Sequence, residues 1–166
     1  MRELELKKIS PDGIPQALEK AEGYRLRNDP AQAESIYRDV LAVDADNQEA
    51  LRGLILSLTD QFGAPDAGHA AHEARAHIGH LTGEYERAYY TGIVFERKTR
   101  AFLGRKHVAR SAAYEGFRQA MEWYERAEAI RPAGNVDAIL RWNSCLRAIE
   151  RERLEPGTPG PELPLE

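Results

Sequence analysis

Four histidines and one glutamate lie close together in the sequence and have the side-chain chemistry of a transition-metal site. They are His69, His72, Glu73, His77 and His80. Successive residues of a helix advance by about 100°, so His69, Glu73, His77 and His80 fall on one face. Imidazole nitrogens and carboxylate oxygens are ligands that zinc and related divalent metals take in proteins. The segment therefore raises a metal-binding hypothesis with these four residues as candidate ligands.

The surrounding pattern argues against a closed metal site. Apolar residues recur at helical spacing on the opposite side of the same helix, so the histidines face solvent with no second element to complete a ligand shell. His72 and His77 also miss the zinc-protease helix motif, which needs two histidines four residues apart. We expect no resident metal or other cofactor, and metal binding by this helix remains an alternative function. The apolar residues are Ala67, Ala71, Ala74, Ile78 and Leu81.

No other pattern in the sequence indicates catalysis. Cys145 is the single cysteine and has no histidine near it in the chain, so we expect a partly buried structural thiol. Gly13 and Gly23 are isolated and follow no predicted strand, so they do not form a phosphate-binding loop. Carboxylates are abundant, but none is marked as a member of a desolvated acid–base pair. We predict that the protein is not an enzyme.

The composition indicates a soluble single domain. The chain has 166 residues, of which 42% are hydrophobic and 30% charged, and its formal net charge is -4 at pH 7. The negative charge argues against a general nucleic-acid binder, and no stretch approaches the roughly 18 apolar residues of a membrane span. The single cysteine allows no intrachain disulfide, and the charged beginning of the chain does not resemble a secretory signal. These features predict a cytoplasmic location and no membrane partner.

The spacing of apolar and turn residues predicts an all-α fold of about seven helices without strands. Asp29 and Pro30 are expected to start the second helix, and Asp46 or Asn47 to cap the third. Residues 1–13 form a predicted lead-in that packs on the first helices, and the Pro- and Gly-rich residues 154–166 form a predicted disordered tail. The predicted helices cover about residues 15–27, 30–43, 47–58, 66–81, 84–104, 107–130 and 135–153.

Two of the predicted helices carry the same spaced pattern. In each, a small residue is followed by a tyrosine four positions later and by an aliphatic residue three positions after that. The small residue allows two helices to approach closely, so the pattern is typical of the buried side of a second helix in a helix–turn–helix repeat. The two stripes are Ala33, Tyr37 and Val40, and Ala120, Tyr124 and Ala127.

With these stripes the chain resembles the tetratricopeptide repeat family, whose unit is 34 residues folded as two antiparallel helices. Tyr24 falls at the first-helix aromatic of the family, whereas Ala71 replaces the second-helix aromatic of the second unit, which is therefore degenerate. Extra residues are expected to lengthen both helices of the third unit. The resemblance implies a short right-handed solenoid of stacked antiparallel helix pairs. Its units are 14–47, 48–81 and 85–134, followed by a capping helix at 135–153.

The resemblance further implies that the first helices of the pairs line a concave groove for a peptide segment or helix of another protein. Leu18 and Glu22 replace the Lys and Asn with which some family members grip a C-terminal carboxylate, so that clamp is not supported. We predict a non-catalytic protein–protein interaction scaffold, chaperone-like by analogy of size. The predicted partner-binding residues are Leu18, Glu22, Arg25, Glu49, Arg52, Leu56, Glu86, Tyr89, Ile93 and Glu96.

Two further hypotheses concern other surfaces. Residues 97–110 are rich in Arg and Lys, with a predicted hairpin tip near Gly104, Arg105 and Lys106. This basic hairpin is an alternative site for an acidic protein or a nucleic-acid backbone, although the net negative charge disfavours nucleic acid. The alanine-rich second unit is expected to leave apolar surface that a second copy would cover, so a homodimer is a further hypothesis.

Overall fold

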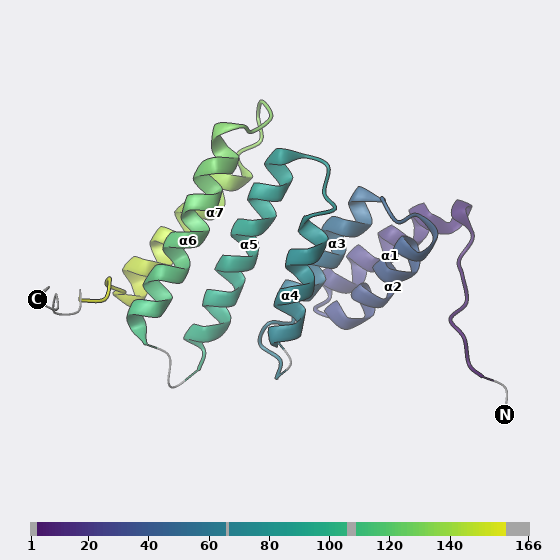
Figure 1. Cartoon of the computed structure of the whole chain (residues 1–166), viewed down its shortest axis with the longest axis horizontal. Coiled ribbons are helices and arrows are strands. Elements are labelled where there is room, and N and C mark those ends of the chain that lie inside the picture. The colour runs from purple at the N-terminus through teal and green to yellow at the C-terminus, as the bar shows by residue number, and fades with distance from the viewer. Residues whose placement is uncertain (1–2, 66, 106–108, 159–166) are drawn as a thin grey trace, which may run out of the picture.

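A computed structural model describes residues 3–65, 67–105 and 109–158 of the chain (Figure 1). Within these residues the protein has seven α-helices, one short 3₁₀ turn at Pro11–Gly13 and no strand. The predicted all-α class and the number of helices are confirmed. The helices are α1 (Ile14–Leu26), α2 (Pro30–Val43), α3 (Gln48–Thr59), α4 (Ala67–Ile78), α5 (Glu84–Leu103), α6 (Arg110–Ala129) and α7 (Asp137–Glu152).

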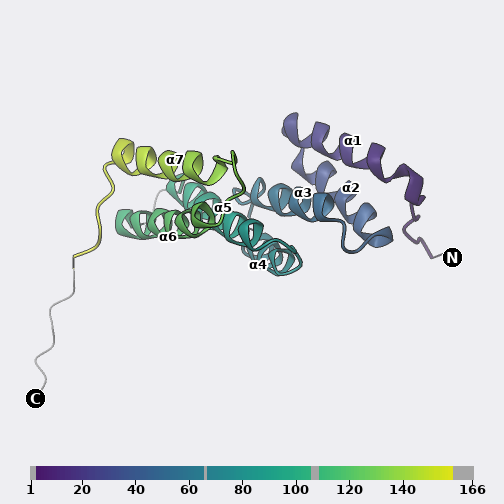
Figure 2. The ribbon, with the colours of Figure 1, turned by 90° about the horizontal axis from the view of Figure 1, so that it is seen from above.

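The helices pack in chain order, each against the next. In addition α1 contacts α3, and α3 contacts α5, so alternate helices are also neighbours. Figure 2 shows α1 and α7 at the two ends of a shallow curve with α3 and α5 between them. The even-numbered helices α2, α4 and α6 lie along the outer side of this curve. The odd-numbered helices therefore share one side of the molecule.

Predicted caps define where α2 and α3 begin. Pro30 opens α2, and the side chain of Asp29 accepts a hydrogen bond from the backbone N–H of Gln32 at 3.3 Å. Asn47, rather than Asp46, caps α3, because its side-chain oxygen accepts from the backbone N–H of Ala50 at 2.9 Å. Each cap satisfies a backbone donor that has no partner within its own helix.

Both predicted stripes are buried, and glycines on neighbouring helices make room for their tyrosines. Tyr37 is 4% exposed and Tyr124 is fully buried. A Cβ atom on Gly53 would lie 2.2 Å from the Tyr37 ring, and one on Gly92 would lie 2.6 Å from the Tyr124 ring. Only glycine avoids these overlaps, so α3 approaches α2, and α5 approaches α6, through the same Gly–Tyr contact.

The core has two parts that meet between α3 and α5. One part comes mainly from α1 to α4 and includes Val94 of α5, and the other comes from α5 to α7 with Leu56 of α3 packed against it. Helices α5 and α6 have 20 residues each, whereas the first four helices have 12 to 14. The expected lengthening of this pair is therefore present.

The lead-in differs from its prediction. Leu4 and Leu6 are 98% and 94% exposed, and only Ile9 of this segment packs on the first part of the core. With only two leucines among Glu3, Glu5, Lys7 and Lys8, this part of the segment has little apolar area to bury against a helix. The prediction of a packed lead-in is therefore wrong for Leu4 and Leu6.

The start of the predicted tail also differs. Leu154 is 5% exposed and belongs to the second part of the core. Arg153 has a φ of 52°, and this left-handed conformation lets the backbone N–H of Leu154 donate to the carbonyl of Ile149 at 2.9 Å. Leu154 thus ends α7 as an ordered hydrophobic cap. Residues 159–166 of the predicted tail lie outside the described residues.

The alanine-rich side of α4 is buried inside the chain. Ala71 is 8% exposed and Ala74 is fully buried, both within the first part of the core. Helices α3 and α5 pack against α4, so this stripe itself is covered within the chain, and association of two copies stays a prediction. Among the described residues, no helix combines the length and low charge that crossing a membrane requires.

Candidate partner-binding face

Helix α5 carries a cluster of three half-buried tyrosines, Tyr85, Tyr89 and Tyr90. The rings of Tyr85 and Tyr89 stack with their centroids 5.8 Å apart, and Tyr90 meets Tyr89 edge-on at 5.2 Å. Tyr89 also contacts the ring of the buried Tyr124, at 5.9 Å between centroids. The cluster is thus anchored in the core on one side and keeps aromatic surface exposed on the other.

Charged side chains of the odd-numbered helices surround Tyr90. Burial raises the pKa of Tyr90 to about 12, and the nearby Arg52 opposes this increase. Arg52 Nη1 lies 3.2 Å from Glu86 Oε1, and this ion pair links α3 to α5. We use the name odd-helix face for the surface formed by Glu22, Arg25, Glu49, Arg52, Asp60, Tyr85, Glu86, Tyr89, Tyr90, Arg97 and Arg141.

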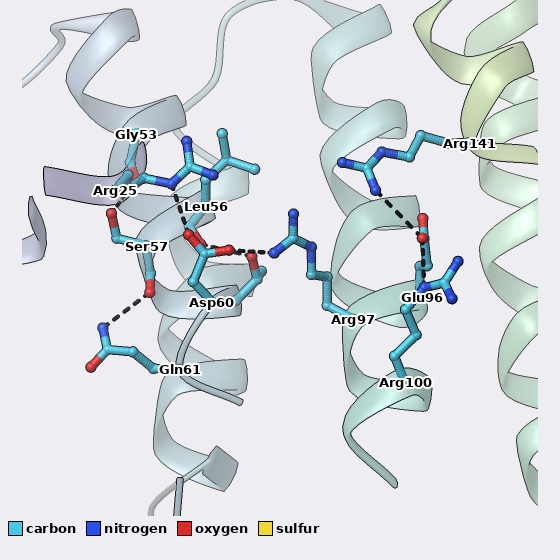
Figure 3. A network of polar contacts seen from close by, with 11 residues as sticks. Arg25, Gly53, Leu56, Ser57, Asp60, Gln61, Glu96, Arg97, Arg100 and Arg141 are labelled. Carbon is cyan, nitrogen blue, oxygen red and sulfur yellow. Dashed lines mark hydrogen bonds and ion pairs between the residues drawn. The ribbon is translucent and has the colours of Figure 1, made fainter. Parts of the chain in front are cut away.

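A carboxylate at the end of α3 joins three helices of this face (Figure 3). Arg25 of α1 donates through Nε to Asp60 Oδ2 at 2.8 Å, and Arg97 of α5 donates to the other oxygen of the same carboxylate. The three side chains are only 18% to 26% exposed, so water screens these contacts less than it would at an open surface. The network fixes the spacing of α1, α3 and α5.

Glu96 lies beneath the odd-helix face rather than on it. It is 1% exposed and accepts hydrogen bonds from the Tyr124 hydroxyl at 2.6 Å and from Arg100 Nε at 2.9 Å. Arg141 of α7 lies 3.5 Å away (Figure 3), and the pKa of Tyr124 is raised by burial and by the Glu96 charge. A carboxylate is buried at tolerable cost only when it is paired in this way. The prediction that Glu96 contacts a partner is wrong.

The other predicted partner-binding residues differ in exposure. Leu18 and Ile93 are 7% and 1% exposed because their sides of α1 and α5 turn into the core, so the prediction is also wrong for these two. Glu22 and Glu49 are exposed. Burial raises the pKa of Tyr37, and the charges of both carboxylates add to this increase. The half-buried residues are Arg25, Arg52, Leu56, Glu86 and Tyr89.

Sequence reasoning missed several residues of this face, although a signal for some was present. Arg52 and Glu86 are 34 residues apart, and Arg25 and Asp60 are 35 apart. These separations match the 34-residue unit of the family that the chain resembles, so opposite charges spaced by that length would predict an ion pair between odd-numbered helices. Arg141 had no such signal, because the lengthened α5 and α6 break the period.

The predicted metal ligands surround a carboxylate that already has a cationic partner. Arg38 Nη1 lies 2.7 Å from Glu73 Oε1, and His77 Nε2 lies 3.5 Å from the same oxygen. His69 is 84% exposed, with Nε2 3.8 Å from the other oxygen, and the ring of His80 lies 6.5 Å from that of His77. In the described part of the chain, no three metal-binding side chains are arranged to hold an ion. The guanidinium of Arg38 would also repel a divalent cation.

The charges of the predicted basic hairpin do not form one continuous patch. Arg97 and Arg100 pair with carboxylates of the core and of the odd-helix face. Arg110 donates to backbone carbonyls at the end of α7. Lys106, at the predicted tip, lies outside the described residues. Three arginines of the segment are therefore engaged in intramolecular contacts.

Cys145 is fully buried, more deeply than expected. Burial raises the pKa of its thiol to about 12, so the thiol stays protonated near neutral pH. Because the thiolate is the reactive form of cysteine, this position is suited to packing and not to nucleophilic chemistry.

Comparisons with family models, with curated proteins and with solved structures found no match to this chain.

Proposed function

We propose that this chain is a non-catalytic scaffold that binds a peptide segment or a helix of a partner protein across the odd-helix face. The observation that carries the proposal is the exposed side of the tyrosine cluster of α5, with Arg52 and Arg141 beside it. Tyrosine and arginine dominate the energetics of protein interfaces, because they combine large contact area with several hydrogen-bonding groups.

The ion pairs between helices support the same proposal. Asp60 holds Arg25 and Arg97 in place, and Glu86 holds Arg52. A face whose side chains are already ordered loses less conformational entropy when a partner binds. The exposed Glu22 and Glu49 extend this face over α1 and α3 and favour partner segments that carry basic side chains next to apolar ones.

We also propose that the helix pairs are tetratricopeptide-like. The buried tyrosine stripes, the close Gly–Tyr contacts and the position of the odd-numbered helices along one curved side support this assignment. In such an arrangement the side shared by the first helices is the one available to a partner segment.

Selection from a random peptide display library tests the proposal. Enriched peptides are expected to bind the native chain and to bind a Glu22→Lys, Glu49→Lys variant at least about tenfold more weakly, because two attractive charges of the face become repulsive. The matched control is Glu122→Lys, Glu128→Lys, which reverses two exposed charges of α6. Fluorescence polarisation measures the affinities.

Equal weakening by the control pair would place the peptide outside the odd-helix face and contradict the proposal. A library that yields no peptide dependent on Glu22 or Glu49 would contradict it as well. Circular dichroism of each variant shows that the helices remain intact, since all four substituted side chains are exposed.

A further inference from the structure

A pocket of about 310 Å³ opens between α4 and the C-terminal part of α5. Its apolar walls come from Phe62, Ala71, Ala101 and Phe102. Phe62 precedes α4 in the chain, and α4 lies on the outer side of the curve in Figure 2. The pocket is lined by none of the residues that form the odd-helix face. It is therefore a separate feature of the surface.

Three cationic side chains also line this pocket: Arg75 of α4, Lys98 of α5 and Arg105, which follows the end of α5. Lys98 Nζ and the Arg105 guanidinium each lie 5.8 Å from the centre of the Phe102 ring, and Arg75 lies 5.5 Å from the Phe95 ring. The contacts with Phe102 hold Lys98 and Arg105 against an aromatic wall of the pocket, whereas Phe95, which contacts Arg75, does not line it. His72 of α4 lines the pocket as well.

These three cations differ from the neighbouring arginines of α5 in whether a carboxylate forms an ion pair with them. Arg97 and Arg100 each have a carboxylate partner in the protein. Among the described residues, no carboxylate oxygen lies within 4.0 Å of Arg75, Lys98 or Arg105. Apolar walls and three cations without a described anionic partner complement a ligand that is both apolar and negatively charged.

We propose that this pocket binds an acidic peptide segment of a partner protein, in which a large apolar side chain fills the space against Phe62 and Phe102 and neighbouring carboxylates meet the three cations. A pocket of this volume takes one such anchoring side chain, and several carboxylates match three positive charges better than a single anion does. The partner of this pocket thus has the opposite charge preference to the partner of the odd-helix face, and neither site depends on the other.

A short fluorescein-labelled peptide of sequence DELFDEL, acetylated and amidated at its ends, is the probe. It is expected to bind the full chain with an affinity that falls as salt is raised, and the uncharged peptide NQLFNQL is expected to bind at least about tenfold more weakly. An Arg75→Glu, Lys98→Glu, Arg105→Glu variant should bind the acidic probe at least about tenfold more weakly. Lys20→Glu, Arg27→Glu, Arg126→Glu is the matched control, because it changes the net charge equally outside the pocket.

Several outcomes would overturn the proposal. They are no saturable binding of DELFDEL, equal loss of binding in the control variant, and equal binding of the uncharged peptide NQLFNQL. Binding at least about tenfold tighter in the Glu22→Lys, Glu49→Lys variant, where two repulsive charges become attractive, would assign the acidic probe to the odd-helix face instead.

Discussion

Glu96 provides the sharpest test of how the last three helices are joined. Its carboxylate is buried between Tyr124 of α6 and the arginines Arg100 and Arg141. Glu96→Gln keeps the volume and one acceptor oxygen but removes the charge. Tyr124→Phe removes only the hydroxyl that donates to this carboxylate at 2.6 Å. The two substitutions therefore separate the charge of the network from its shortest hydrogen bond.

The expected magnitudes follow from the contacts. A hydrogen bond to a charged group contributes about 1.5–3 kcal/mol, so Tyr124→Phe should lower the free energy of unfolding by about 2 kcal/mol. Glu96→Gln should cost about 3 kcal/mol, near the lower limit for breaking a buried pair, because Arg100 and Arg141 each keep about a third of their surface in water. The double variant should lose about 1 kcal/mol less than the sum, since Glu96→Gln weakens the same hydrogen bond that Tyr124→Phe removes.

Urea unfolding followed by far-UV circular dichroism and by tryptophan fluorescence measures these losses. Trp123 and Trp142 both lie in the C-terminal helices and report directly on this region. Glu152→Gln is the surface control, because its ion pair with Arg151 is largely exposed and should contribute less than about 1 kcal/mol. A loss for Glu96→Gln no larger than that of Glu152→Gln, or strict additivity in the double variant, would refute the structural role assigned to the network.

Further predictions concern helix packing and the histidine segment. Gly92→Ala should lower the free energy of unfolding by about 1–3 kcal/mol in urea titrations, because the new methyl group overlaps the Tyr124 ring, whereas Gly68→Ala meets nothing within 4 Å and should be neutral or stabilising. The hydrogen bond from Arg38 lowers the pKa of Glu73, so this pair stabilises the fold fully above the ordinary carboxyl pKa of 4.5 and less as the pH falls through the lowered value. Glu73→Gln should therefore flatten the acid side of a plot of stability against pH, and an unchanged plot would exclude this contribution. Arg38→Gln should strengthen zinc binding about tenfold over the native chain in calorimetric titrations by freeing the carboxylate, and equal affinities would show that Arg38 does not control it.

Much of the helical fold could be predicted because local patterns determine it. Tyr37 and Tyr124 stand at helical spacing from small and aliphatic residues, and both are buried as that spacing indicates. Asp29 and Asn47 cap helices through backbone atoms only three residues away. Such interactions depend on residues that are neighbours in the sequence, so a single sequence contains the necessary information.

The candidate site was predicted less completely because its contacts are distant in the sequence. Glu96 resembles a surface residue of an amphipathic helix, yet its partners Tyr124 and Arg141 lie 28 and 45 residues later. Arg38, which lies on a different helix, pairs with Glu73 and makes this carboxylate unavailable as a metal ligand. In both cases a small rotation of one helix relative to another decides whether a charge faces water or a partner, and helical spacing alone does not determine that rotation.

Hydrogen–deuterium exchange with a display-selected peptide most directly tests the claim that the odd-helix face binds a partner segment. Binding is expected to slow exchange of backbone amides in α3 and α5, around Arg52 and Tyr89, and to leave α2, α4 and α6 unchanged. Slowed exchange confined to the even-numbered helices, with none in α3 or α5, would contradict the account.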